Sequence, residues 1–73
     1  MSIYRKVQNL IDDFNFGFIT PSGAARITID LILIEHGGTA KVSEIVEEAR
    51  NLSGLDWFAD MVQSEFNMMR RAA

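Results

Sequence analysis

The chain has 73 residues, of which 48% are hydrophobic, and this length accommodates one small domain. It contains no cysteine, so disulfide bridges and thiolate metal sites are excluded and the hydrophobic core has to stabilise the fold. Ten acidic residues outnumber seven basic ones, for a net charge of −3. This balance argues against a general nucleic-acid binder, because affinity for phosphate comes chiefly from Lys and Arg.

No membrane-spanning segment is expected from the sequence. The longest apolar-rich stretch, residues 27–34, is interrupted by Thr28 and Asp30 and is far shorter than the ~20 residues that cross a bilayer. The first six residues include two bases but are followed by no apolar signal region. We therefore expect a soluble protein in the cytoplasm.

The first predicted helix covers residues 2–16. Ser2 is a suitable N-cap, and Gly17 follows the segment as glycine commonly follows a helix C-terminus. The apolar residues recur at spacings of one, three and four, which gathers them on one helical face. These residues are Ile3, Tyr4, Val7, Leu10, Ile11 and Phe14.

The second predicted helix covers residues 21–36. Thr20 can cap it while Pro21 takes the first helical position, where its missing N–H costs nothing. Residues 26–34 are rich in β-branched side chains and partly alternate, so a strand is the alternative for this stretch. A helical stripe and a second apolar side favour a central helix that ends at Gly37 and Gly38. The stripe comprises Ala24, Ile27, Leu31 and Ile34, and the second side Ala25, Ile32 and Leu33.

Two further helices are predicted over residues 42–52 and 55–70. Gly54 separates them, and Ser53 is expected to cap the last helix with Asp56 three residues on. The last helix carries an apolar stripe and ends with Arg70 and Arg71, which suit the negative end of its dipole. The stripe is formed by Leu55, Phe58, Val62, Phe66 and Met69. Together the segments predict an all-α fold, a single domain over residues 1–73 built as a bundle of four helices.

Residues 24–69 resemble the helix-turn-helix core of winged-helix regulators in helix order and apolar spacing. In those families the last helix of the core reads the DNA major groove. Here that helix is expected to expose acids and to have no base before Arg70, and repulsion from phosphate makes direct DNA binding the less favoured alternative. The acids are Asp56, Asp60 and Glu65 on this helix and Glu44, Glu47 and Glu48 on the preceding one.

No constellation of residues indicates catalysis. His36 is the only histidine and lies near the end of a predicted helix, where a capping or surface role is favoured over a catalytic one. Asp56 and Asp60 lie four apart on one helical face, and solvated surface acids are favoured there over a shared divalent ion. The glycines form no phosphate loop. We expect a protein that is not an enzyme and binds no cofactor or metal.

Two groups of residues are candidate protein-binding sites. Trp57, Met61 and Met68 fall on a second face of the last helix, next to Arg70 and Arg71, and Trp and Met are enriched in interfaces. The alternative is that Trp57 and Met61 pack under the first helix. The second candidate is Tyr4, Arg5 and Lys6, where bases at a helix N-terminus are mildly unfavourable unless an acidic partner offsets them.

In size, acidity and helical make-up the whole chain resembles small bacteriophage proteins that bind and inhibit host RNA polymerase. The resemblance implies a transcription regulator that binds a polymerase subunit in the bacterial host cytoplasm and inhibits transcription or prevents its termination. A DNA-binding helix-turn-helix regulator is the alternative. An assembly module that self-associates through Trp57 and the methionines is a third possibility, and we expect a monomer or weak dimer.

Overall fold

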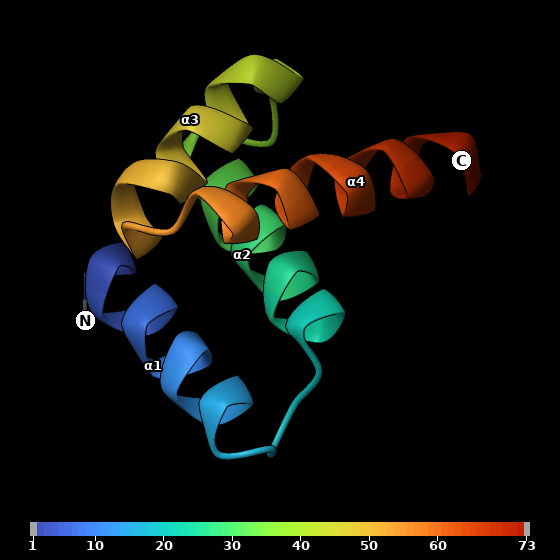
Figure 1. The fold of residues 1–73 in the computed structure, drawn as a ribbon. Coiled ribbons are helices and arrows are strands. Elements are labelled where there is room, and N and C mark those ends of the chain that lie inside the picture. Colours follow the sequence, from blue (N-terminus) through green and yellow to red (C-terminus); the bar gives the residue numbers. More distant parts are fainter. Residues whose placement is uncertain (1, 73) are drawn as a thin grey trace.

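A computed structural model describes residues 2–72, which form four helices and no strand. They are α1 (Ile3–Asn15), α2 (Pro21–Glu35), α3 (Val42–Ser53) and α4 (Asp56–Ala72) (Figure 1). The predicted all-α bundle is therefore confirmed, and residues 26–34 are helix, not strand. Residues 1 and 73, at the ends of the predicted domain, lie outside the described part.

Local hydrogen bonds fix the starts of the first two helices where the sequence predicted them. The Ser2 hydroxyl accepts from the backbone N–H of Arg5 at 3.2 Å, and the Thr20 hydroxyl accepts from that of Gly23 at 3.0 Å. Both side chains satisfy an N–H that the helix itself leaves unbonded. Pro21 occupies the first turn of α2, as expected.

The turn between α3 and α4 differs from the prediction in one respect. Ser53 was expected to cap α4, but it is the last residue of α3. Its hydroxyl donates to the Ala49 carbonyl at 2.7 Å and accepts from the Leu55 N–H at 3.1 Å, so it closes the turn and does not cap the next helix. Gly54 adopts a left-handed conformation, φ 71°, that ends α3.

Helix α2 lies at the centre of the molecule and packs against all three other helices (Figure 1). Its fully buried Ile29 and Ile32 meet Ile45 of α3 and Phe58 and Val62 of α4 in one core. Val7 and Ile11 supply the buried side chains of α1. The prediction of a central second helix is thus correct.

The stripe that the sequence suggested on α2 is only partly in this core. Ala24 is fully buried, but Ile27 is 42% exposed and Ile34 is 75% exposed. The helix is apolar nearly all round, so its pattern did not reveal which side meets the other helices. The core uses the side of Ala25, Ile29 and Ile32 instead.

The domain measures 30 × 25 × 19 Å along its principal axes. The N-terminus of α1 and the C-terminus of α4 lie on opposite sides of it (Figure 1). Within residues 2–72 we find no helix with the length and apolarity needed to cross a bilayer.

Candidate protein-docking surfaces

Trp57 stands at the start of α4, 45% exposed, with its ring held in place by two aromatic neighbours. The Phe14 ring of α1 meets it edge-on at a centroid distance of 5.4 Å, and Phe58 meets it at 5.9 Å. Such contacts fix the ring orientation. Trp57 therefore packs against α1, as one interpretation predicted, while nearly half of its surface remains exposed to solvent.

Three residues extend this surface along α4 at helical spacing. Met61, Ser64 and Met68 follow Trp57 at intervals of four, three and four, which places them on one face of the helix. Met61 is half-buried against the core, whereas Met68 is exposed. We call these four residues the α4 stripe. The stripe begins with the rigid aromatic ring of Trp57 and ends with the flexible thioether of Met68. Both kinds of side chain are common at protein interfaces.

The basic residues predicted to bind a partner do not form a single site. Arg70 and Arg71 are exposed near the C-terminal end of α4, beyond Met68. Tyr4, Arg5 and Lys6 are exposed on the first turns of α1, on the opposite side of the molecule (Figure 1). Of these four bases only Arg71 continues the face of the α4 stripe, because it follows Met68 by three residues, whereas Arg70 lies on another side of the helix.

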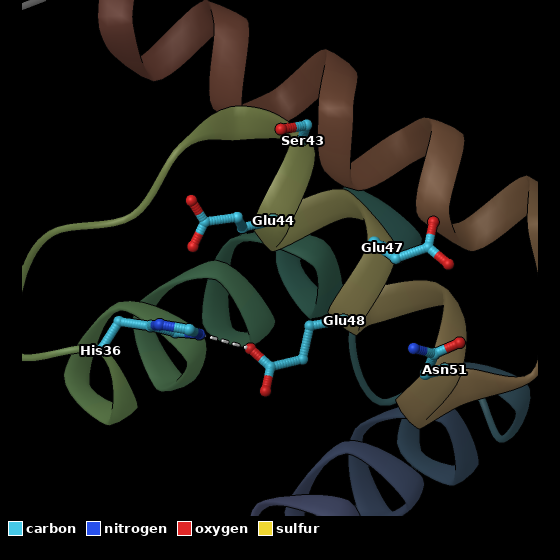
Figure 2. A pocket seen from close by; sticks show the side chains of 6 residues that line it. All are labelled: His36, Ser43, Glu44, Glu47, Glu48 and Asn51. Atoms are coloured by element: carbon cyan, nitrogen blue, oxygen red, sulfur yellow. Dashed lines mark hydrogen bonds and ion pairs between the residues drawn. The ribbon is translucent and has the colours of Figure 1, made fainter.

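The outer face of α3 is acidic. Figure 2 shows the carboxylates of Glu44, Glu47 and Glu48 projecting from one side of the helix, beside Ser43 and Asn51. His36, the C-cap residue that follows α2, places its Nε2 2.9 Å from a Glu48 oxygen and so links the two helices. This contact is consistent with the surface role expected for His36.

Asp56 and Asp60 of α4 are exposed, as expected, and of these two only Asp56 forms an ion pair with a described residue. Asp56 accepts from the Arg50 Nε at 3.2 Å, while the same guanidinium donates to Glu47 at 2.7 Å. Arg50 thus ties α3 to the first turn of α4. Among residues 2–72 no group of three or more acidic, histidine or cysteine side chains is placed to hold a metal ion.

Glu65 was expected on the exposed face of α4, and that prediction is wrong. Its side chain is only 10% exposed and lies between α4 and α2. One carboxylate oxygen accepts from the Ser22 hydroxyl at 2.6 Å and the other from the Arg26 Nε at 3.0 Å. These two hydrogen bonds, Ser22 first, lower the pKa of Glu65 despite its burial. Glu65 joins helices rather than facing a partner.

A further apolar surface escaped the sequence reasoning. Leu31 and Lys6 lie at the middle of a shallow groove between α2 and α1. Ile34 lines one end of the groove and Ile27 the other. A signal was available: a helix that is apolar on every side has more apolar surface than one core uses. We call this surface the α1–α2 groove.

No protein-family model, curated protein or solved structure matches this chain. The surfaces described above are therefore interpreted through their own chemistry. The α4 stripe and the α1–α2 groove are apolar and exposed, whereas the α3 face is acidic. Each of these properties bears on the kind of molecule that the protein contacts.

Proposed function

We propose that this protein is a non-enzymatic regulator that acts by binding another protein through the α4 stripe. The observation that carries the proposal is Trp57: a large ring, 45% exposed, held edge-on by Phe14 at 5.4 Å. Tryptophan dominates interface hot spots, and a ring already fixed in place loses little entropy on binding. Met68 and Arg71, three residues beyond it, extend the same face of α4.

The charge of the outer helices favours protein over DNA as the partner. Glu44, Glu47 and Glu48 cover the exposed side of α3 (Figure 2), and Asp56 and Asp60 are exposed on α4. Phosphates brought near these carboxylates would be repelled, and Arg70 and Arg71 offer few compensating contacts. A helix-turn-helix core with this surface is better suited to contact protein.

The specific partner that we propose is a subunit of bacterial RNA polymerase. It rests on the resemblance of the whole chain to phage inhibitors of that enzyme in size, acidity and helical make-up. Such a small protein would inhibit transcription, or prevent termination, by stabilising one conformer of the polymerase or by excluding a sigma factor. It would work in the cytoplasm of the bacterial host.

Binding to purified RNA polymerase tests both parts of the proposal. We expect the wild-type protein to bind the core enzyme saturably in an interferometry assay. Trp57→Ala should weaken binding about thirtyfold, the effect of losing a hot spot of ~2 kcal/mol. Met68→Asp should weaken it as well without unfolding the protein, because Met68 is largely solvated. Labelled duplex DNA should not bind at 150 mM salt, on the order of physiological ionic strength.

Phe18→Ala is the matched control, since Phe18 is an aromatic side chain 76% exposed in the turn between α1 and α2 and is not part of the stripe. It should bind like wild type. If neither stripe variant binds more weakly than this control, the α4 stripe is not the docking surface. If wild type binds no polymerase, that partner is wrong. Tight DNA binding with a steep salt dependence would favour the alternative regulator.

A further inference from the structure

We propose that the α1–α2 groove is the contact surface of a weak, two-fold symmetric homodimer. The proposal is independent of the α4 stripe. The groove is lined by the exposed Ile27 and Ile34 and the partly buried Leu31, which are spaced four and three apart on α2. With 3.6 residues per turn, these three side chains lie within about 60° of one another. They form a straight apolar ridge along the outer side of the central helix.

A two-fold axis that runs along the ridge, parallel to α2, makes this ridge complementary to itself. The second α2 then runs parallel to the first, so Ile27, Leu31 and Ile34 each meet their counterpart in the other copy. Symmetric contacts of this kind use the same patch on both subunits, as closed dimers do. Burial of Ile34, 75% exposed in the single chain, supplies much of the driving force.

The charges beside the ridge fit the same arrangement. Lys6 lines the groove on the α1 side, next to Leu31. Asp30 is exposed on the opposite side of the ridge, about 1.5 Å from Leu31 along the helix axis. The two-fold rotation exchanges the sides, so the Asp30 of each copy comes to lie over the Lys6 of the other, and the pair occurs twice.

Within one chain these two side chains do not meet, and neither forms an ion pair anywhere in residues 2–72. Both are therefore available to a second copy. A stable dimer buries ~800 Å² per partner. That is about a sixth of the 4601 Å² surface of this chain, whereas the ridge and the charge pair supply far fewer than the roughly 20–30 residues that each side of such an interface uses. We accordingly expect a dissociation constant on the order of 100 μM, the regime of small interfaces.

Sedimentation equilibrium from ~10 μM to ~1 mM brackets that value and tests the proposal. Wild type should dimerise over this range, and backbone NMR signals of residues 27–34 and of the first half of α1 should shift on dilution. Ile34→Asp should abolish dimerisation and leave the helical circular dichroism unchanged, because Ile34 is mostly solvated. Phe18→Ala, an equally exposed control outside the groove, should dimerise normally.

A charge exchange tests the pairing itself. Lys6→Asp and Asp30→Lys should each weaken the dimer about tenfold, since each places like charges together twice across the axis. The double variant restores opposite charges and should recover most of the lost affinity. A wild-type monomer at 1 mM, a dimer that survives Ile34→Asp, or a double variant no tighter than the single ones would overturn the proposal. So would dissociation by Trp57→Ala alone.

Discussion

The carboxylate of Glu65 should contribute to the free energy of unfolding in a way that depends on pH. It is nearly buried and accepts hydrogen bonds from Ser22 at 2.6 Å and Arg26 at 3.0 Å. A hydrogen bond to a charged group contributes about 1.5–3 kcal/mol. Arg26 is 57% exposed, so solvent reduces its share to well under 1 kcal/mol, on the order of a surface ion pair.

Glu65→Gln keeps the shape and one acceptor oxygen but removes the charge. We expect it to lower the free energy of unfolding at pH 7 by about 1.5 kcal/mol, mainly through the weaker bond from Ser22. For a domain of this size that loss corresponds to a fall of ~10 °C in Tm. Urea denaturation followed by circular dichroism gives the difference directly.

The free energies of unfolding of wild type and Glu65→Gln should converge in acid. The pKa of Glu65 in the folded chain lies below its ordinary value of 4.5, so the folded state holds the charged form more tightly than the unfolded state does. Its stabilisation is complete above pH 4.5 and is lost as pH falls through the folded pKa. Below that point wild-type Glu65 is neutral and resembles Gln, so the difference should shrink as the pH falls below 4.5 and be clearly smaller at pH 3 than at pH 7.

Asp60→Asn serves as the control, because Asp60 lies on the same helix, is exposed, and its replacement changes the net charge equally. It should alter stability by less than about 0.5 kcal/mol at either pH. The reasoning fails if Glu65→Gln is as stable as wild type at pH 7. It fails equally if the gap between them stays constant down to pH 3.

Three further substitutions test the core, a turn and a cap by the same urea denaturation. Phe58→Ala should cost about 3–5 kcal/mol and leave little folded protein, because Phe58 is the largest fully buried side chain; a loss below 1 kcal/mol would contradict its place in the core. Gly54→Ala should cost about 1 kcal/mol from the left-handed φ of 71° alone, since a new Cβ meets nothing within 4 Å. Thr20→Ala should cost about 1 kcal/mol as its bond to Gly23 is lost, whereas Thr20→Ser should cost a few tenths.

Features set by neighbours in the sequence could be predicted from it. Ser2 and Thr20 cap their helices through hydrogen bonds to residues only three positions away in the sequence. Pro21 marks the start of α2, and glycines mark where helices end. The predictions of four helices and of a central α2 were therefore correct. The prediction that Ser53 caps α4 was wrong, because its hydroxyl bonds to the Ala49 carbonyl and so extends α3 instead.

Features set by distant partners could not be predicted. Glu65 reads as a surface acid because its partners, Ser22 and Arg26, lie 43 and 39 residues away in the sequence. Ile34 was predicted to lie in the apolar stripe of the core, because the pattern of an all-apolar helix does not show which side its neighbours cover. For the candidate site, the exposure of Trp57 and Met68 was anticipated, while the separation of Lys6 from Arg70 and Arg71 depended on the fold.

The two proposed surfaces lie on different helices, and this separation makes their effects distinguishable. Ile34 is on α2 and contributes to the groove, whereas Trp57 is on α4, with its ring against Phe14 of α1. If a dimer presents two copies of the α4 stripe to a partner, loss of dimerisation weakens binding to an immobilised, multivalent target but leaves the affinity of a single site unchanged. Ile34→Asp should then act only on the multivalent surface, while Trp57→Ala should act on both. The same two variants would reverse their effects if the groove were the docking surface for the partner and the stripe the dimer contact.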